Sequence, residues 1–494
     1  MEGDAIYLNN GMEAVQAKYI DSPLEEFNNP LIQALNPMLD EATIIKKMMV
    51  NPPIKEEEKE LDNVFRIHIL QRLYQFFQPL PIHLEVWNMI HSLIIQSYIA
   101  RNPFDANYRR YLHATGKQII NRSFDLNSKA NFRTTANCGT LIGISGMGKT
   151  TSTNRVLSHI NQVIVHSEYK GKHFDQIQLV WIKLEAPHNS SLKALCLQFF
   201  MKIDELLGTN NFKNYVSRNL SVDAMLPMVA QLARTVCLGL LIIDELQNIR
   251  NKGAEQIMNF FVSLINSCGV SIILIGTPAS YSIFENELRI ARRLTGSGQI
   301  FYNNMKKNNE FKFFLESLWK YQWTKKYTPL TDEFIDVIYE ETQGISDLVV
   351  KIFLNSQKYQ IQKNKEVLTT TVFRKVSKEQ FGFMSGMLEA VRSGNPYKIA
   401  KYQDIQSVKD FNKIPDKTKE TPRKVIKERK VESIKNSTVE KDTKSKIEIK
   451  KDYIQGDLRL FPLQAKDEDR LSFDLLLENG VIDDMELWIR GNDS

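Results

Sequence analysis

The chain has 494 residues, of which 43% are hydrophobic and 25% are charged, a composition typical of soluble globular proteins. Its formal net charge of +6 is small for this length and does not by itself indicate a nucleic-acid partner. The N-terminus lacks the basic and apolar regions of a signal peptide, and no apolar run is long enough for a membrane span, so we expect a cytoplasmic protein with no membrane partner. The four cysteines fit neither a zinc site nor a disulfide framework and are expected to be buried thiols.

Residues 1–60 mix proline, asparagine and acidic residues, and they predict an extended N-terminal arm. Apolar residues then recur at helical spacing, which predicts a helical N-terminal region over 61–130. Within 131–307, short apolar runs at 140–145, 179–184, 239–245 and 270–277 alternate with longer helical patterns. Uninterrupted apolar strands separated by helices are typical of a parallel sheet that helices cover on both faces.

Strand signals end near residue 307, and four helical patterns predict a helical lid over 308–405. A charged linker is expected over 406–452, where the stretch from Lys409 to Asp452 has 15 Lys and Arg against 9 Asp and Glu. The segment 453–494 has 4 against 10 and is predicted to be an acidic docking tail. The predicted fold class is therefore α/β: a P-loop NTPase core with a parallel β-sheet, a helical lid, a helical N-terminal region and an extended C-terminal tail.

Residues 143–150 read GISGMGKT and match the phosphate-loop pattern G-x-x-x-x-G-K-[ST] between an apolar strand and a helix. The glycines let backbone N–H groups surround phosphates, Lys149 is expected to reach the β- and γ-phosphates, and the Thr150 hydroxyl to hold Mg²⁺. We therefore predict that ATP and Mg²⁺ bind here. The expected nucleotide contacts of this loop are Gly143, Ser145, Gly146, Met147, Gly148, Lys149, Thr150 and Thr151. The alternative is a glycine-rich turn that binds no ligand.

The run LLIIDE at 240–245 is an apolar strand that ends in two carboxylates, at the edge of the sheet where ligands of open α/β folds bind. Asp244 is predicted to hold the nucleotide-bound Mg²⁺ through water, together with Thr150. Glu245 is the predicted catalytic residue that orients or deprotonates the attacking water. The second carboxylate favours an ATPase over a kinase or GTPase. The alternative is that the two acidic residues only cap a following helix.

Two further features could contact the γ-phosphate. Thr277 follows the strand at 270–276 and occupies the sensor-1 place of AAA+ proteins, although Thr-Pro is also ordinary loop chemistry. Downstream, Arg289, Arg292 and Arg293 cluster on about one and a half helical turns. They could act across a subunit interface as an arginine finger, and the alternative is a solvated basic helix end.

Longer stretches resemble the TnsC family, AAA+ transposition regulators of Tn-seven-like bacterial DNA transposons. The similar runs are GISGMGKTTS at 143–152, LEAPHNSSLKALCLQFF at 184–200, LGLLIIDELQNI at 238–249, the run at 258–293 and QGISDLVVKIF at 343–353. The resemblance continues through 387–402 and back to NPLIQAL and YIARNP, so that it covers most of residues 28–405. These stretches are more specific than the two nucleotide motifs, which many ATPases share.

The resemblance implies a bacterial cytoplasmic AAA+ ATPase that forms a ring or helical filament of identical subunits around duplex DNA, independently of sequence. It also implies that the protein couples a target-selection protein of TnsD or TniQ type to transposase and endonuclease subunits, with ATP hydrolysis controlling assembly and disassembly. In such an assembly Arg292 or Arg293 is the favoured finger. The lid departs from many AAA+ relatives, which carry an arginine where this chain has Ser346-Asp347, and Lys351 is the expected substitute.

In the TnsC family DNA contacts come from loops that face the bore of the ring. The matching segment here supplies Ser190, Ser191 and Lys193, with Arg218 as a further candidate for backbone phosphates. A lone surface lysine is as often simply solvated. NNPLIQAL and the acidic stretch LSFDLLLENGVIDDMELW are candidate docking segments, and the alternative for the latter is that it covers the protein's own lid.

Two other functions remain open at this point. A helicase loader or an origin-binding AAA+ ATPase would share the nucleotide core but would not account for the two docking segments. A signalling scaffold could bind the nucleotide as a switch without contacting DNA.

Overall fold

The computed structural model describes residues 5–120, 133–216, 221–280 and 296–395 apart from Asn9 and Arg250, together with Ile283, Lys398, Lys401 and Tyr402. The chain divides into two compact units, Met1–Lys417 and Thr418–Ser494. The described residues all belong to the first unit. The predicted charged linker at 406–452 and the acidic tail at 453–494 lie outside them.

The core is built on a five-stranded sheet with the order β6-β7-β8-β3-β9, in which every neighbouring pair is parallel. Its strands are β3 (Cys138–Gly143), β6 (Trp181–Glu185), β7 (Leu240–Asp244), β8 (Ser271–Gly276) and β9 (Gln299–Tyr302). The four strands predicted from apolar runs are confirmed, and β9 is an addition. All residues of β3, β7 and β8 are buried, as expected of strands that helices cover on both sides.

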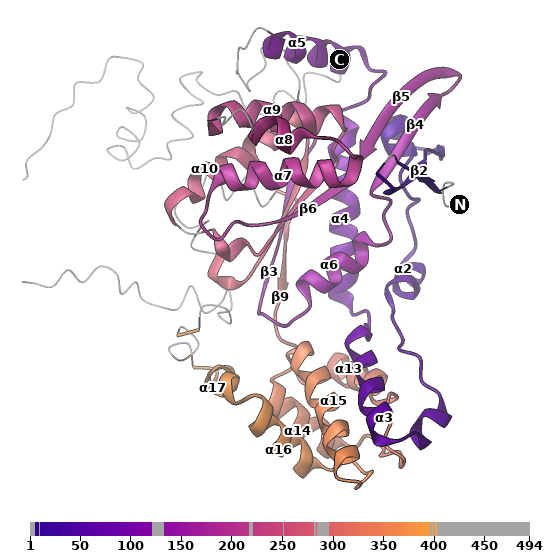
Figure 1. Cartoon of the computed structure of the whole chain (residues 1–494), viewed down its shortest axis with the longest axis vertical. Helices are drawn as coiled ribbons and strands as arrows, with labels where there is room; N and C mark the ends of the chain where they lie inside the picture. Colours follow the sequence, from indigo (N-terminus) through magenta and orange to yellow (C-terminus); the bar gives the residue numbers. More distant parts are fainter. Residues whose placement is uncertain are drawn as a thin grey trace, which may run out of the picture. The chain divides into compact units, whose positions relative to one another are not determined.

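Helices cover both faces of this sheet (Figure 1). Alternate residues of β7 point to opposite faces, so that Ile242 joins one hydrophobic cluster and Ile243 the other. The first cluster includes α4 (Pro81–Ile99) and α6 (Lys149–Leu157); the second includes α7 (Leu192–Leu207), α9 (Val222–Thr235) and α10 (Asn251–Ser263). Each fully buried Ile or Leu contributes about 1.5–3 kcal/mol to this packing.

The core carries several further elements. They are α5 (Ala106–Ile120), α8 (Asn211–Val216), the 3₁₀ turns η4 (Leu246–Asn248) and η6 (Pro278–Ser280), and the π-helical turn η5 (Leu264–Cys268) that extends α10. The predicted parallel α/β core with flanking helical regions is thus confirmed.

The N-terminal segment adds strands to a second sheet. This four-stranded sheet has the order β1-β2-β4-β5 and consists of β1 (Ala5–Tyr7), β2 (Glu13–Gln16), β4 (Val163–Tyr169) and β5 (Lys172–Leu179). The turn η1 (Glu25–Phe27) and helices α1 (Pro30–Gln33) and α2 (Glu41–Met48) follow and bury Leu31 and Met48 completely. Much of the segment expected as an extended arm is therefore packed on the core, through strand pairing between residues about 150 positions apart.

The lid is helical, as expected. It contains α13 (Asn309–Trp319), α14 (Asp332–Thr342), α15 (Ser346–Gln362), α16 (Thr370–Gln380), the turn η7 (Gly382–Met384) and α17 (Ser385–Ser393). Trp319 lies at its centre, with ring centroids 5.1, 5.0 and 5.9 Å from those of Phe334, Phe353 and Phe373. These aromatic contacts join α13 to the three helices that follow.

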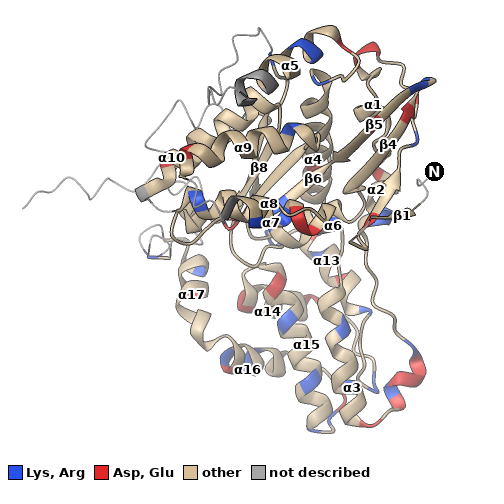
Figure 2. Ribbon diagram, turned by 45° about the horizontal axis from the view of Figure 1, so that its top comes forward, with Lys and Arg blue, Asp and Glu red and all other residues tan. Residues whose placement is uncertain are grey.

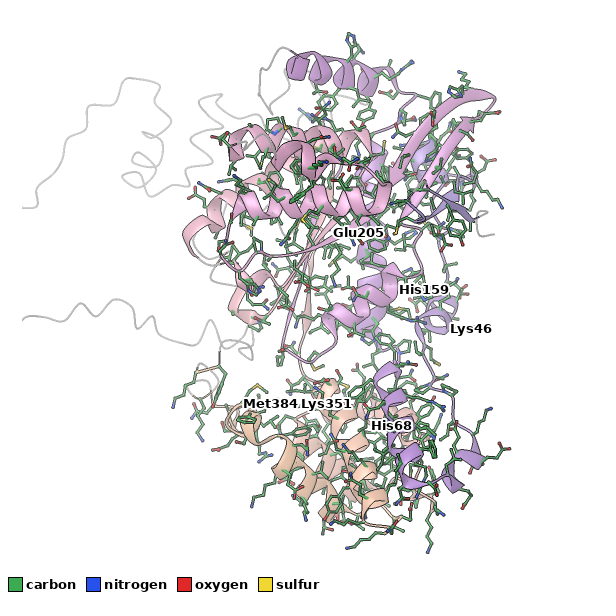
Figure 3. All side chains as sticks on the ribbon, viewed as in Figure 1. Lys46, His68, His159, Glu205, Lys351 and Met384 are labelled. Atoms are coloured by element: carbon green, nitrogen blue, oxygen red, sulfur yellow. The ribbon has the colours of Figure 1, made fainter. Side chains whose placement is uncertain are left out.

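The predicted helical N-terminal region is divided between lid and core. Helix α3 (Asn63–Ile69) and the turn η3 (Leu70–Gln75) pack against α15 of the lid, whereas α4 packs against the core strands. Figure 3 shows His68 of α3 among the lid side chains and His159, just after α6, in the core. The chain therefore passes from lid to core between Gln75 and Pro81.

An acidic turn and a buried ion pair hold this region on the lid. In η2 (Glu56–Glu60), visible as a mostly red segment near α3 in Figure 2, Glu58 accepts hydrogen bonds from Arg72 (2.8 Å) and from the Trp323 indole (2.9 Å). The Arg66 guanidinium, 1% exposed, binds both carboxylate oxygens of Glu366 at 2.7 and 2.8 Å. Burial would raise the pKa of Glu366, but the hydrogen bonds from Arg66 and the Lys325 N–H outweigh it and lower this pKa.

We expect Glu366→Gln to lower the free energy of unfolding by about 3 kcal/mol, because it leaves the Arg66 charge buried without its counter-charge. Urea unfolding followed by tryptophan fluorescence measures the change. A lowered folded pKa stabilises the protein above the unfolded pKa, near about pH 4, so the difference from wild type should shrink as the pH falls. The exposed Lys398–Glu389 pair provides the control, since Glu389→Gln should change stability by less than about 1 kcal/mol. Equal effects of the two substitutions would contradict the role of the buried pair.

Two further findings bear on the composition of the chain. Cys138, Cys196, Cys237 and Cys268 are all buried and free of disulfides, as predicted. In the part of the chain that the structure describes, no helix combines the length and apolar character needed to cross a bilayer.

Candidate nucleotide-binding site

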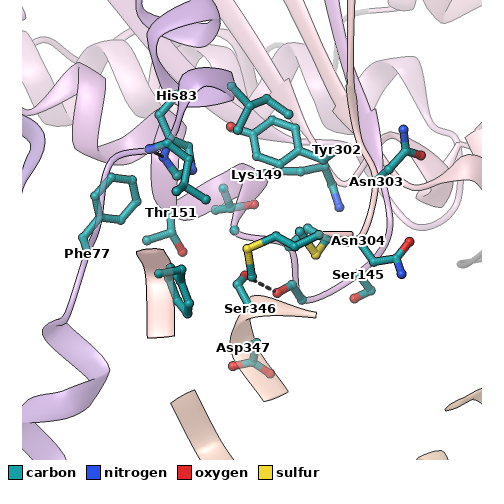
Figure 4. Close-up of a pocket in the computed structure, with 18 of the residues that line it drawn as sticks. Phe77, His83, Ser145, Lys149, Thr151, Tyr302, Asn303, Asn304, Ser346 and Asp347 are labelled. Carbon is teal, nitrogen blue, oxygen red and sulfur yellow. Dashed lines mark hydrogen bonds between the residues drawn. The ribbon is translucent and has the colours of Figure 1, made fainter. Parts of the chain in front are cut away.

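A large cavity opens at the carboxyl ends of the strands of the parallel core sheet. It has a volume of about 750 Å³ and is lined by the phosphate loop, the ends of β7, β8 and β9, the start of α15 and the segment from Leu73 to Glu85. Figure 4 shows the residues that surround it, with Lys149 and Tyr302 on the core side and Ser346 and Asp347 on the lid side. This is the edge where ligands of open α/β sheets bind.

The phosphate loop has the backbone that anion binding requires. Gly146 and Gly148 have φ of +82° and +83°, values that favour glycine, and a side chain at Gly148 would meet no atom within 4 Å. Helix α6 begins directly after Gly148, so its N-terminal N–H groups and partial positive charge face the cavity. The other predicted contacts Ser145, Met147, Thr150 and Thr151 also line it.

Two residues of the predicted motif, Lys149 and Gly143, contact neighbouring parts of the core. The Lys149 ammonium donates hydrogen bonds to the carbonyl oxygens of Gly143 (2.7 Å) and Ile144 (3.0 Å), so it is held beside the loop that it is expected to serve. Gly143 is at the end of β3 rather than on the cavity wall, and a Cβ there would lie 2.3 Å from Tyr302. Glycine is thus needed at this position for strand packing as well.

The predicted metal ligands are in contact. The Thr150 hydroxyl donates to Oδ2 of Asp244 at 2.9 Å, and the Glu245 N–H donates to Oδ1 at 2.9 Å. A hydroxyl that donates its hydrogen still has two lone pairs, so Thr150 remains able to coordinate Mg²⁺. The Lys183 ammonium, which sequence analysis missed, lies 2.9 Å from the same Oδ2.

Glu245 has an unusual backbone conformation at the strand tip. Its φ is +57°, in the left-handed region, which costs a non-glycine residue about 1–3 kcal/mol and occurs often at functional sites. The turn η4 follows at once, and the side chain of Gln247 returns to donate a hydrogen bond to the Glu245 carboxylate. The side-chain oxygen Oε1 of Gln247 accepts a hydrogen bond from the Thr277 N–H at 3.0 Å. Gln247, also missed by sequence analysis, therefore joins the two predicted catalytic residues.

Thr277 provides an independent sign that the cavity takes a polar ligand. Thr277 is 6% exposed and lines the cavity, and its hydroxyl oxygen has no hydrogen-bond partner among the described atoms. Buried hydroxyl groups are nearly always hydrogen-bonded, so an orphan in a roomy cavity fits a missing acceptor such as a phosphate oxygen. Together with the phosphate loop and the Thr150–Asp244 pair, this residue set fits ATP with Mg²⁺.

The lid contacts the phosphate loop through the start of α15. The Ser346 hydroxyl and the Asp347 N–H both donate to the Gly146 carbonyl oxygen at 3.1 Å. Lys351, the expected sensor-2 substitute, does not line the cavity, and its ammonium lies 2.6 Å from the Asp347 carboxylate. The structure thus brings Asp347, rather than Lys351, to the cavity wall.

The N-terminal segment supplies a wall that sequence analysis did not foresee. Phe77 and His83 stand on this side in Figure 4, with ring centroids 4.7 Å apart. The Leu80 N–H donates to Nδ1 of His83 at 2.9 Å, and burial lowers the pKa of His83 to about 4. His83 is therefore neutral at physiological pH and presents an apolar, aromatic surface beside the phosphate loop.

The remaining predicted site residues lie apart from the cavity or outside the described residues. Ser190 is 7% exposed, Ser191 caps α7 through the Ala194 N–H, and Lys193 is half-buried on the first turn of α7. These three form one short segment after β6. Arg218, Arg289, Arg292 and Arg293 fall outside the described residues.

Comparison with known proteins identifies the domain that contains most of this site. A family model described as "AAA domain" matches residues 132–284. No curated protein matches the sequence. Residues 132–284 thus form an AAA domain, in agreement with the parallel sheet and the phosphate loop described above.

Several solved structures are similar at low identity. The ORC1 protein of Aeropyrum pernix in complex with DNA is 15% identical, with a TM-score of 0.33, over 56% of this chain and 64% of that one. A Walker-type ATPase of Pyrococcus abyssi is 14% identical, with a TM-score of 0.31, over 60% and 78%. Drosophila ORC bound to DNA is 12% identical, with a TM-score of 0.31, over 64% and 77%. The chain spans 64% of the first of these structures.

Proposed function

We propose that this AAA-domain protein is an ATP-hydrolysing regulator of DNA transposition that assembles on duplex DNA. The observation that carries the ATPase part is the meeting of Thr150, Asp244, Glu245 and Thr277 around one cavity, beside a phosphate loop. The transposition part is supported by the sequence resemblance to the TnsC family over most of residues 28–405.

For nucleotide binding, each wall of the cavity has a distinct task. The N–H groups of the phosphate loop hold the phosphates, and the Lys149 ammonium turns from its carbonyl partners toward the β- and γ-phosphates. Thr150 and Asp244 would hold Mg²⁺, which neutralises phosphate charge when bound. Phe77 and His83 provide an apolar wall on which a flat base can pack.

For hydrolysis, Glu245 is the group that orients or deprotonates the attacking water. Its carboxylate is exposed and accepts a hydrogen bond from the Gln247 side-chain amide, so its position is fixed while water can still reach it. The Thr277 hydroxyl, which has no hydrogen-bond partner among the residues that the structure describes, is available to a γ-phosphate oxygen. Because Gln247 contacts both residues, it is a positioning residue for the water and for the phosphate together.

Assembly would complete the site from outside the subunit. The lid presents the acidic residue Asp347 to the cavity, with Lys351 bound to it, so the positive charge needed near the γ-phosphate is not supplied by Lys351 in this arrangement. An arginine from a neighbouring copy, chosen from Arg289, Arg292 and Arg293, would supply it. This expectation agrees with a ring or helical filament of identical subunits as the working form.

On DNA, we expect Lys193 to contact backbone phosphates, with Ser191 beside it and Arg218 as a second candidate. Ser190 is buried and would act only through its backbone. Such contacts are independent of sequence, which fits a protein that receives its target from a partner. That partner would be a target-selection protein of TnsD or TniQ type, and the transposase and endonuclease subunits would follow, in the bacterial cytoplasm.

A DNA-binding experiment tests this function. We expect the protein with a non-hydrolysable ATP analogue to retard duplex DNA of arbitrary sequence, and the apparent affinity to fall steeply with salt because phosphate contacts release counterions. Lys193→Ala should weaken binding uniformly across sequences and reduce the salt slope by about one.

The matched control is Lys202→Ala, on the same helix α7 but paired with Glu205, which should bind DNA as the wild type does. Unchanged mobility of duplex DNA across salt concentrations, with the analogue bound, would refute the DNA-binding function and favour a nucleotide-switched scaffold.

A further inference from the structure

A lysine lies directly against the carboxylate that would hold Mg²⁺. Lys183 is on the edge strand β6, where its backbone pairs with Ile242 of β7, two residues before Asp244. Its ammonium is 2.9 Å from Oδ2 of Asp244 and donates to the Asn154 side-chain oxygen at 2.8 Å. The side chains of Lys183 and Asp244 are 19% and 6% exposed, so the pair is largely withdrawn from water.

The contacts of Asp244 show why this lysine matters. Oδ1 accepts the Glu245 N–H, and Oδ2 accepts both the Thr150 hydroxyl and the Lys183 ammonium. Of these three donors only Lys183 carries a formal charge, so it is the counter-charge of this carboxylate. A buried carboxylate without a counter-charge is strongly destabilising, which gives the ion pair a structural value before any ligand binds.

The same geometry places the Lys183 ammonium where it would repel a metal ion bound at Asp244. A metal ion held by Thr150 and Asp244 would lie within a few ångströms of Lys183, and like charges at that distance repel strongly in a partly buried site. Asn154, on helix α6, offers the ammonium a neutral hydrogen-bond acceptor that it already contacts. Lys183 can therefore leave Asp244 without losing every partner.

We propose that Lys183 is a built-in counter-ion of Asp244 that occupies the carboxylate in the metal-free state and sets the affinity for Mg²⁺ by competition. Asn154 holds the ammonium when it moves aside. This inference rests on the proposed nucleotide-binding function and adds a residue that controls the metal requirement of the site. The protein consequently needs a higher concentration of Mg²⁺ to bind nucleotide with the metal than it would without this lysine.

The test compares Lys183→Met, which keeps the length of the side chain and removes its charge, with wild type in the full chain. Binding of a fluorescent ADP is titrated with Mg²⁺, and thermal melting is recorded in EDTA without nucleotide. We expect the Mg²⁺ midpoint to fall about tenfold and the metal-free melting temperature to fall by about 2–4 °C. Lys183→Arg should restore the melting temperature and raise the Mg²⁺ midpoint toward that of wild type.

The control Lys202→Met removes a lysine from an exposed ion pair and should leave both readouts unchanged. A Mg²⁺ midpoint that is unchanged or raised in Lys183→Met overturns the proposal. If that variant does not fold, Asn154→Ala serves instead: losing the resting place of the ammonium should raise the midpoint, and an unchanged midpoint overturns the proposal equally. A wild-type protein that binds no nucleotide at any Mg²⁺ concentration would refute the proposed function itself.

Discussion

Replacing Lys149 with alanine is expected to weaken ATP binding by at least about 100-fold, which corresponds to the loss of charge-assisted hydrogen bonds worth about 3 kcal/mol. The residue is 9% exposed and its ammonium lies against the phosphate-loop carbonyls, so it is already held at the base of the cavity. Because assembly is proposed to require ATP, the variant should also fail to form ATP-dependent oligomers. Fluorescent-nucleotide titration and light scattering measure the two effects.

The control is Lys202→Ala, which removes a lysine of α7 that does not line the cavity and should retain wild-type affinity. Thermal melting should show both variants folded, since the two hydrogen bonds lost in Lys149→Ala join residues of a loop that α6 and β3 anchor independently. ATP-dependent oligomers of Lys149→Ala would contradict the assignment of the cavity as the nucleotide site.

Glu245→Gln is expected to lower the rate of ATP hydrolysis by about 10²- to 10⁴-fold, the range that a positioned general base contributes. ATP affinity should change little, because the cradle of the phosphates does not include this side chain. Glutamine has nearly the same shape, and its carbonyl oxygen can still accept the hydrogen bond from Gln247, so the geometry at the strand tip should persist. Phosphate release under single-turnover conditions, together with nucleotide binding, separates the two effects.

If hydrolysis controls disassembly, the same variant should accumulate as DNA-bound oligomers in the presence of ATP. Gel mobility or electron microscopy after addition of unlabelled competitor DNA measures their lifetime. Normal hydrolysis by Glu245→Gln would remove the role assigned to this carboxylate. Loss of ATP binding would show instead that Glu245 supports the structure of the cavity.

The local motifs could be predicted because each is a short run of chain whose chemistry depends on its neighbours in sequence. The phosphate loop needs only its glycines, a lysine and a threonine between a strand and a helix, and GISGMGKT supplies them. The strands at the core were equally visible, since a strand covered on both faces is an uninterrupted apolar run. The approach of Thr150 to Asp244 then follows from two parallel strands that end at the same edge.

Contacts between distant segments could not be predicted in this way. Lys183 lies on a strand that reads as ordinary core sequence, and only the pairing of β6 with β7 brings its ammonium to Asp244. The pairing of β2 with β4 likewise joins a polar N-terminal segment to the core, and polar composition alone suggested an arm. The sequence indicates Gln247 only weakly, as a polar residue two positions after Glu245. Its contact with Thr277 depends on the left-handed backbone conformation of Glu245.

In the described residues the chain connects the lid and the core three times, from Met48 to Glu56, from Gln75 to Pro81 and from Asn303 to Asn308, and the last two crossings border the cavity. Three covalent connections restrict how the lid can move relative to the core. Ser346 and Asp347 of the lid already touch Gly146, so a change in the phosphate loop would also shift the start of α15. Under the proposed function, binding or loss of the nucleotide would therefore be transmitted from the phosphate loop to the lid through contacts that already exist.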